Sequence, residues 1–283
     1  MHGLTPESQG IELQDDNSKF DPQRSRETRN EEALEFEQDI ILIFSVPSNT
    51  MFLLGSLCYV MLSVVDLLEW EKSNSLDDDA SSISIFDHFY TNVGIIGALL
   101  LILNVAIDIC RCFNLYVTSQ LSLCHEDLRA DISSAFFFGC AAFVDLWVAL
   151  PSHHSVRFDA DLGVISAHLY FFSAVCAMTG LAYDPSNTVV MLNFKGDIMF
   201  MFGSLIDLVV SYISDPDIVD SNQRILLALG LLSSILWFAD ACLYLLADFY
   251  FWRQSKNRVS DATGQDSLEC LLEMEHSEVV AFV

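Results

Sequence analysis

The stretch MFMFGSLIDL, residues 199–208, combines an apolar run with one acidic residue, Asp207, near its middle. A closely similar stretch, MFLLGSLCYV, occupies residues 51–60 and lacks the acid. No basic residue stands near Asp207 in the sequence. Apolar runs that recur along one chain are typical of membrane-spanning helices. This stretch therefore raises two questions: whether the chain contains a repeat, and why an acid lies within an apolar run.

The composition of the whole chain is that of an integral membrane protein. Of its 283 residues, 52% are hydrophobic and 12% aromatic, which is more apolar than is usual for a soluble domain of this length. The formal charge of −26 comes from 39 acidic and 13 basic residues, and the acids gather outside the apolar runs. Such a surplus repels nucleic acid, so we predict the lipid bilayer, and no nucleic acid, as a partner.

Six apolar segments are long enough, or nearly long enough, to cross a hydrocarbon core of about 30 Å as helices. The second and the fifth are short, and flanking residues would extend them. A further run, IILIFSV at residues 40–46, is too short to span and fits an interfacial turn or an extension of the first helix. We predict an all-α polytopic membrane protein with six transmembrane helices, at residues 50–68, 93–109, 132–150, 162–181, 198–213 and 225–252.

The two ends of the chain differ in composition from the apolar region between them. Residues 1–39 contain eleven acids and few apolar residues, which predicts a disordered segment without a signal peptide. The tail at 253–283 is similar, with one or two amphipathic turns. The predicted organisation is a disordered N-terminal segment, a six-helix domain at residues 40–252, and a cytoplasmic tail.

The basic residues predict the orientation of the chain. With the N-terminus in the cytoplasm, ten of the thirteen Lys and Arg residues lie on the cytoplasmic side, and three, Lys72, Arg157 and Arg224, lie on the other side. Short loops rich in Lys and Arg stay in the cytoplasm. We therefore expect a multi-pass protein with both termini cytoplasmic.

The spans group into three helical hairpins, at residues 50–112, 132–181 and 198–252. The first helix of each carries a pair of small residues preceded by aromatics, and the second opens on glycine. Small residues let helices approach closely in lipid, although membrane helices in general are rich in glycine. The residues predicted to serve helix packing are Gly55, Ser56, Gly97, Gly139, Gly203, Ser204 and Gly230, with Cys140 in the place of the middle serine.

A helix with FLLGS or FMFGS, a short loop and a glycine-led second helix together resemble the YrhK-type two-helix membrane domain. The resemblance covers residues 50–112 and 198–252. It covers 132–181 less well, because FFFGC replaces the glycine–serine pair there. It implies a membrane fold made of repeated two-helix units and no particular activity.

Acidic residues inside the predicted spans are the main candidates for function. A carboxylate at the bilayer centre is costly, so such residues tend to face the interior of the bundle and to act in function. With no Lys or Arg among them, each must be protonated, hydrated or bound to a cation. The candidate ion pathway consists of Asp145, Asp207 and Asp240, expected to lie deepest, together with Asp66, Asp108 and His168.

The same acids also allow a structural interpretation. Asp66 and Asp108 lie near predicted helix ends, where a carboxylate reaches headgroup water, and Asp145 and Asp207 can form hydrogen bonds across helices when protonated. We therefore predict a structural or assembly component that binds lipid or other membrane proteins, or forms a homo-oligomer. The alternative is a cation or proton channel or transporter that uses these carboxylates.

Other residue patterns carry less information. Cys110, Cys112, Cys124 and His125 fall in the loop after the second span and are zinc-ligand types, but their spacing is not a familiar zinc pattern. We predict no metal and no other cofactor. The sequence contains no metalloprotease, serine hydrolase, phosphate-loop or kinase motif, so we expect a protein that is not an enzyme.

Overall fold

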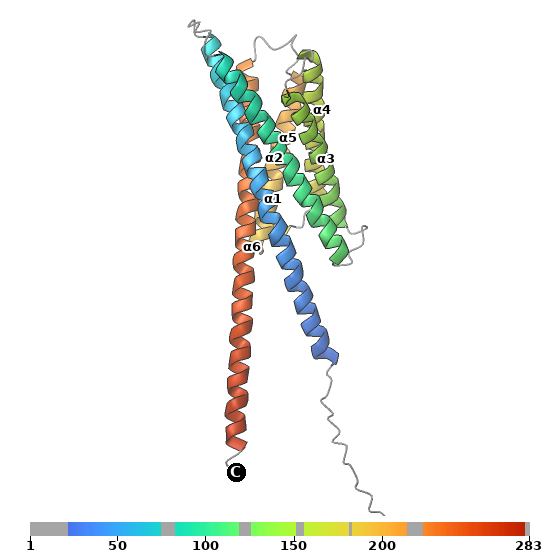
Figure 1. The fold of residues 1–283 in the computed structure, drawn as a ribbon, viewed down its shortest axis with the longest axis vertical. Helices are drawn as coiled ribbons and strands as arrows, with labels where there is room; N and C mark the ends of the chain where they lie inside the picture. Colours follow the sequence, from blue (N-terminus) through green and yellow to red (C-terminus); the bar gives the residue numbers. More distant parts are fainter. Residues whose placement is uncertain are drawn as a thin grey trace, which may run out of the picture.

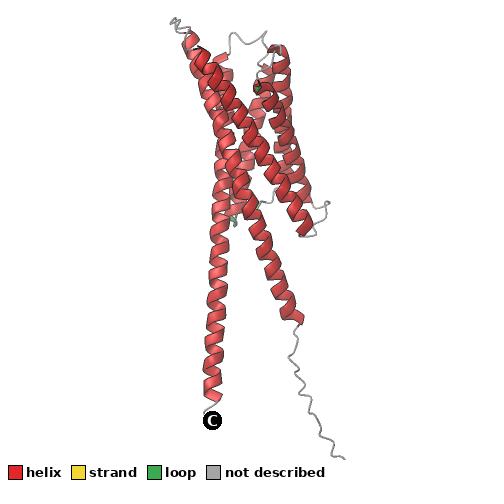
Figure 2. Cartoon of the chain, viewed as in Figure 1, coloured by secondary structure: helices red, strands yellow, loops and turns green. Residues whose placement is uncertain are grey.

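The computed structural model describes residues 22–74, 83–118, 126–150, 156–180, 183–213 and 223–280. No strand occurs in these ranges, and Figure 2 shows long helices throughout the described chain. The prediction of an all-α protein is confirmed. The six helices are α1 (Pro22–Asn74), α2 (Ile83–Thr118), α3 (Glu126–Ala149), α4 (Val156–Thr179), α5 (Thr188–Ile213) and α6 (Gln223–Val280).

Each helix contains a segment long and apolar enough to cross a membrane, which confirms the six predicted spans. The fifth begins at Thr188 rather than at residue 198, because Lys195 and Asp197 interrupt the apolar run without interrupting the helix. The second is likewise longer than predicted. The segments are Leu42–Lys72, His88–Val117, Leu128–Ala149, Arg157–Thr179, Thr188–Ile213 and Gln223–Gln254.

The two ends of the described chain are more helical than the sequence suggested. Helix α1 begins at Pro22, which corrects the prediction of a disordered segment for residues 22–39 and makes residues 40–46 an extension of the first helix. Proline suits the first position of a helix, and the Glu, Arg and Gln residues that follow extend a helix that the span has already nucleated. Helix α6 likewise continues to Val280. Residues 1–21 and 281–283 lie outside the described residues.

The six helices form a ring in chain order. The helices of each predicted hairpin pack together, α2 contacts α3, α4 contacts α5, and α1 packs against α6 to close the ring. Figure 1 shows that α1 begins and α6 ends on the same side of the bundle, where both helices project beyond it. We call this the terminal side and the opposite side the distal side.

Aromatic side chains fill the middle of the ring. Phe52 of α1, Phe138 of α3 and Phe200 of α5 meet there, with ring centroids 5.7, 6.4 and 5.8 Å apart. Trp237 lies 5.5 Å from Phe200, and Tyr170 lies 5.1 Å from Phe138. All five rings are buried, and the edge-on and tilted contacts are favourable for aromatic pairs. We call Phe52, Phe138 and Phe200 the phenylalanine floor.

Large apolar side chains cover the outside of the bundle. Every helix exposes some of them, although a water-soluble protein rarely leaves large continuous apolar patches uncovered. A surface of this kind is suited to lipid tails, so it agrees with the apolar spans. Examples are Leu54, Leu103, Phe143, Phe172, Phe202 and Leu232.

Candidate functional site

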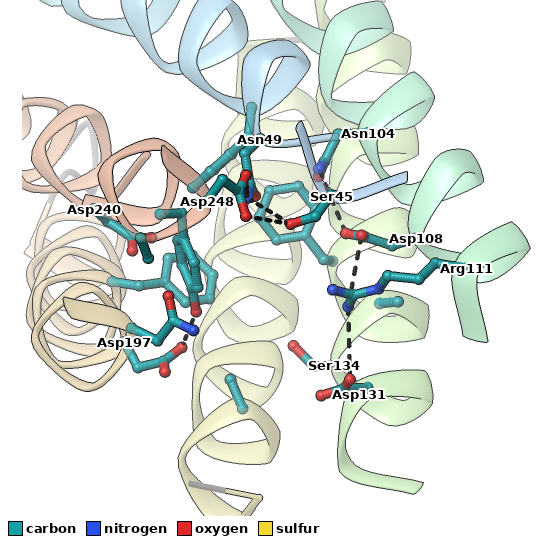
Figure 3. Close-up of a pocket in the computed structure, with 18 of the residues that line it drawn as sticks. Ser45, Asn49, Asn104, Asp108, Arg111, Asp131, Ser134, Asp197, Asp240 and Asp248 are labelled. Atoms are coloured by element: carbon teal, nitrogen blue, oxygen red, sulfur yellow. Dashed lines mark hydrogen bonds and ion pairs between the residues drawn. The ribbon is translucent and has the colours of Figure 1, made fainter. Parts of the chain in front are cut away.

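A cavity of about 430 Å³ occupies the terminal half of the ring, and all six helices line it (Figure 3). Its lining extends from Leu42 and Val189, at the terminal ends of their spans, to the phenylalanine floor. A volume of this size falls within the range of small-molecule binding sites, about 300–1,000 Å³. The cavity is therefore large enough for an organic solute.

Acidic side chains dominate the charge of this cavity. Two of them come from α6, and α2, α3 and α5 contribute one each. A single guanidinium accompanies them among the described lining residues, so the formal charge is strongly negative. A concave surface with one sign of charge concentrates ions of the opposite sign. The charged lining residues are Asp108, Arg111, Asp131, Asp197, Asp240 and Asp248.

On the wall made by α2 and α3, Arg111 lies between two carboxylates. Its guanidinium is 3.7 Å from Asp108 and 3.6 Å from Asp131, and Asn104 donates a long hydrogen bond of 3.5 Å to Asp108. This corrects the expectation that no base accompanies the acids. The predicted span ended at residue 109, but α2 continues to Thr118 and carries Arg111 within the cavity wall.

Between α1 and α6, Asp248 has two neutral hydrogen-bond donors. Ser45 donates through Oγ at 2.7 Å, and Asn49 donates through Nδ2 at 2.8 Å. Both donors precede Phe52 on one face of α1, at helical spacing. These bonds join the first and last helices, so Asp248 helps to close the ring.

The wall made by α5 and α6 carries two acids and no base among the lining residues described. Asp197 is 5% exposed and accepts a hydrogen bond from the Tyr244 hydroxyl. Asp240 is 1% exposed, and its Oδ1 has no hydrogen-bond partner among the described residues. Figure 3 shows both acids on the opposite wall from Arg111. An unpartnered buried carboxylate is costly, so Asp240 marks a place where a proton or a ligand is expected.

Buried polar pairs join α1 to α2 and α3 to α4 at the level of Asp240. Asn104 donates through Nδ2 to Ser48 Oγ at 2.7 Å, and Ser48 also lies 3.3 Å from the Asn104 carbonyl oxygen. Ser134 and Ser173 are hydrogen-bonded through their hydroxyls at 3.0 Å. In both pairs a serine of the first helix satisfies a polar side chain of the second.

The corresponding place between α5 and α6 holds a glycine and an acid. Ser48, Ser134 and Gly196 each stand four residues before one phenylalanine of the floor. A Cβ on Gly196 would lie 2.6 Å from Asp240 Oδ1, so the two residues face each other directly. Because Gly196 has no hydroxyl, Asp240 lacks the partner that its counterparts have.

Asp145, one of the acids expected to lie deepest, contributes to neither cavity and ties three helices together. It accepts hydrogen bonds from Tyr59 of α1 and Tyr170 of α4, both at 2.8 Å, through Oδ2. Its Oδ1 accepts a short bond of 2.5 Å from Ser166. Both carboxylate oxygens are therefore satisfied by hydroxyl donors.

A second cavity of about 330 Å³ lies on the distal side between α1, α5 and α6, and Asp66 lines it. The Tyr90 hydroxyl donates a weak bond of 3.4 Å to Asp66. Asp207 lies on α5 beside Ser233 and close to Asp145, and it lines neither cavity. The phenylalanine floor stands between the two cavities.

His168 lies outside both cavities, at the contact between α4 and α5. Its Nδ1 donates to the Val164 carbonyl at 2.7 Å, which leaves Nε2 to accept from the Tyr212 hydroxyl at 2.9 Å. Of the six residues in the predicted pathway, the structure brings Asp108 and Asp240 together in the terminal cavity. The other four are elsewhere.

Sequence reasoning missed Asp131, Asp197 and Arg111 as members of the site. The two acids stand one residue before predicted spans, and the predicted second span ended two residues before Arg111. A usable signal was helical spacing, because Asp240 and Asp248 are two turns apart on one helix face with Tyr244 between them. Spacings of four and three residues likewise place Asn104, Asp108 and Arg111 on one face of α2.

The small residues predicted for packing have different surroundings. A Cβ at Gly55, Gly97, Gly139 or Gly203 would come within about 3 Å of a side chain on a neighbouring helix. Ser56 and Ser204 are also buried. Gly230, by contrast, has nothing within 4 Å of an added Cβ and lines the distal cavity.

The cysteines considered as metal ligands are only partly described. Cys110 is exposed and Cys112 is buried, both on α2, whereas Cys124 and His125 lie outside the described residues. Within the described ranges, no three His, Cys, Asp or Glu side chains lie close enough together to hold a metal ion.

No family model matches the chain, and comparisons with curated proteins and with solved structures gave no match. The resemblance to the YrhK-type domain thus rests on its sequence pattern, and the function is inferred from the cavity.

Proposed function

We propose that this protein is a membrane transporter for a cationic solute, which binds in the terminal cavity. The observation that carries this proposal is the cavity itself, where five carboxylates and one guanidinium line a space at the depth of the membrane spans. Acids at this depth are costly, and a bound cation would offset that cost. The proposal favours the transporter alternative over a purely structural role and does not involve enzymatic chemistry.

The phenylalanine floor favours a carrier over an open pore. Its three rings, backed by Trp237, separate the terminal cavity from the distal cavity that Asp66 lines. A carrier exposes its site to one side of the membrane at a time, and movement of one part of the bundle against another opens the other side. With both termini in the cytoplasm, the cavity described above would be the cytoplasmic access route.

We also infer that the three hairpins are repeats, aligned on the phenylalanine floor. On this alignment Ala141 and Ala142, rather than Gly139 and Cys140, correspond to the glycine–serine pairs of the other hairpins. Contacts between serine side chains and the main chain support it, because Ser166 Oγ lies 3.5 Å from the Ala141 carbonyl oxygen and Ser233 donates to the Gly203 carbonyl at 3.0 Å. Transporters are commonly built from such repeats, and the YrhK-type unit is our proposal for each hairpin.

Charge movement in reconstituted liposomes tests the transporter proposal. The full-length protein would be adsorbed on a solid-supported membrane and exposed to Na⁺, K⁺, methylammonium and spermidine in turn. We expect at least one cation to produce a saturable current that Asp240→Asn abolishes and Asp161→Asn preserves, since Asp161 is exposed near the distal end of α4. Currents no larger than those of protein-free liposomes for all four cations would refute the proposal.

The two projecting helices support a second candidate, an assembly component. Helices α1 and α6 continue beyond their spans on the terminal side, from Pro22 and to Val280 respectively. Such extensions offer contact surfaces for a second copy or for another membrane protein. This candidate predicts that ending the chain after Lys256 changes the number of protein chains in the complex, measured by light scattering, whereas Asp240→Asn does not.

A further inference from the structure

We propose that the solute is a linear aliphatic polyamine, one ammonium group of which binds Asp240 between α5 and α6. The inference rests on the proposed transport function and names its substrate class. It also gives the α5–α6 contact a role that the other two helix pairs lack.

The break in the pattern of polar pairs identifies the binding position. Between α1 and α2, and between α3 and α4, a serine side chain satisfies the polar residue of the second helix. Between α5 and α6 that serine is replaced by Gly196, and Asp240 Oδ1 is left without a partner in the described part of the chain. The missing donor is therefore expected to come from a ligand.

The chemistry of the nearby groups favours an ammonium ion. Asn193 also lines the cavity, and its Oδ1 is a second buried acceptor without a partner among the described residues. Asp197 directly follows Gly196, which faces Asp240, and both acids line the cavity. An ammonium group offers three donors, no acceptor and one positive charge, which matches these three oxygen-bearing side chains. The serine counterparts in the other two pairs leave no such vacancy.

The remaining charges favour more than one ammonium group. Asp248 follows Asp240 by eight residues on α6, about 12 Å along the helix axis, and lines the same cavity. Asp108 and Asp131 share Arg111, so Asp197, Asp240 and Asp248 are the acids without a cationic neighbour within 4 Å among the described residues. A flexible chain with separated ammonium groups can reach both positions.

The volume of the cavity and the spread of its acids over three walls disfavour an inorganic ion. A bare metal ion needs several ligands around one point, whereas the described acids are spread over three walls and no three of them gather at one place. The cavity of about 430 Å³ leaves room for methylene groups against the phenylalanine floor. Aromatic faces also attract ammonium groups.

Titration calorimetry on the full-length protein in lipid nanodiscs tests this inference. Spermidine, butylamine, NaCl and MgCl₂ would be titrated at matched ionic strength. We expect spermidine to bind about tenfold more tightly than butylamine, because a second charged hydrogen bond contributes to binding. Equal affinities for spermidine and butylamine, or displacement of spermidine by equimolar Mg²⁺, would overturn the polyamine assignment.

Substitutions at Asp240 and Asp248 test the binding of the two ends of the ligand independently. Asp240→Asn should weaken both amines about tenfold or more, whereas Asp248→Asn should weaken spermidine and leave butylamine nearly unchanged. Asp161→Asn, on the exposed distal part of α4, serves as the matched control and should leave both affinities unchanged. An Asp248→Asn protein that binds spermidine as tightly as the original chain would contradict a site in which Asp240 and Asp248 bind different ammonium groups of one ligand.

Gly196→Ser tests the missing-partner argument without removing an acid. The added hydroxyl would reproduce the serine found in the other helix pairs, and the end of the Asp240 side chain can turn to meet it. We expect about a tenfold loss of spermidine affinity with an unfolding temperature at least equal to that of the original chain. Undiminished spermidine binding by this folded variant would overturn the inference. A current from another cation in the transport assay would then still support the proposed function.

Discussion

Gly203 of α5 lies against the indole of Trp237 of α6, so closely that a Cβ at position 203 would come 2.7 Å from Trp237 Nε1. Trp237 is 4% exposed and packs against Phe200 and Tyr170, with ring centroids 5.5 and 4.5 Å away. The indole cannot move aside without disturbing the aromatic centre of the ring. This contact therefore sets the separation of α5 and α6 beside the proposed site.

Gly203→Ala is predicted to destabilise the protein by about 1–3 kcal/mol, the usual cost of overpacking a filled core. Gly230→Ala is the matched control, because an added Cβ there meets nothing within 4 Å. The control should be neutral or stabilising by up to about 1 kcal/mol, since alanine favours helix more than glycine does. Thermal unfolding in one detergent measures both. Equal stabilities for the two variants would contradict the close-contact interpretation.

Asp145→Leu is predicted to reduce stability and to leave cation binding intact. The change leaves the hydroxyls of Tyr59, Ser166 and Tyr170 without their acceptor, and each unsatisfied buried donor costs about 1–3 kcal/mol. Because Asp145 lines neither cavity, spermidine affinity should stay within about twofold, as for independent distant sites. Thermal unfolding and calorimetry measure the two effects. A large loss of affinity in a folded variant would restore Asp145 to the ion pathway.

A double-mutant cycle with Tyr170→Phe separates this hydrogen bond from other effects of the substitution. Removing the Tyr170 hydroxyl should cost less stability in the Asp145→Leu protein than in the original chain, by about 0.5–3 kcal/mol for groups in direct contact. Additive losses of stability would mean that the two side chains do not interact.

The six crossings were predictable because lipid imposes one strong rule, that a spanning helix must present apolar side chains over its whole length. The predicted borders fell at the first polar residue of each run. Helix α5 shows why this fails, since Lys195 and Asp197 lie within a helix that begins at Thr188. Polar residues near a span end can face the bundle interior, and hydropathy does not record that direction.

The terminal cavity was only partly predictable for a related reason. Hydropathy identified Asp108 and Asp240 as acids inside spans, but it could not show which helices are neighbours or which faces meet. Asp145 is likewise an acid inside a span, yet hydroxyls from α1 and α4 enclose it. The ring order of the helices distinguishes a satisfied acid from an unpartnered one, and that order is a property of packing.

The connection between α4 and α5, at residues 183–187, gives a prediction about pH. Asp184 Oδ1 accepts hydrogen bonds from the Ser186 hydroxyl at 2.6 Å and the Ser186 amide at 2.9 Å, and these bonds lower the pKa of Asp184. A lowered pKa means that the folded state favours the ionised carboxylate. The resulting stabilisation is complete above the ordinary carboxyl pKa and is lost as pH falls through the lower pKa of the folded state.

Ser186→Ala removes the hydroxyl donor and retains the amide. We expect the variant to be slightly less stable than the original chain above the ordinary carboxyl pKa, and the difference to vanish at lower pH where Asp184 is protonated. Thermal unfolding in detergent across this pH range measures the difference. A difference that grows on acidification would show that the bond favours the protonated acid instead.

Two phenylalanines of α3, two residues apart, test whether the phenylalanine floor is the barrier of the carrier. Phe138 is 7% exposed and belongs to the floor, whereas Phe136 is 60% exposed on the outside of the bundle. Phe138→Ala would remove one of three rings that separate the two cavities, so we expect a passive cation leak in liposomes that Phe136→Ala does not produce. The loss of packing should also cost about 3–5 kcal/mol of stability. If that cost prevents folding, Phe138→Leu keeps most of the side-chain volume and should give a smaller leak. If liposomes that contain folded Phe138→Ala protein do not leak cations, the barrier does not depend on the Phe138 ring and lies elsewhere in the bundle.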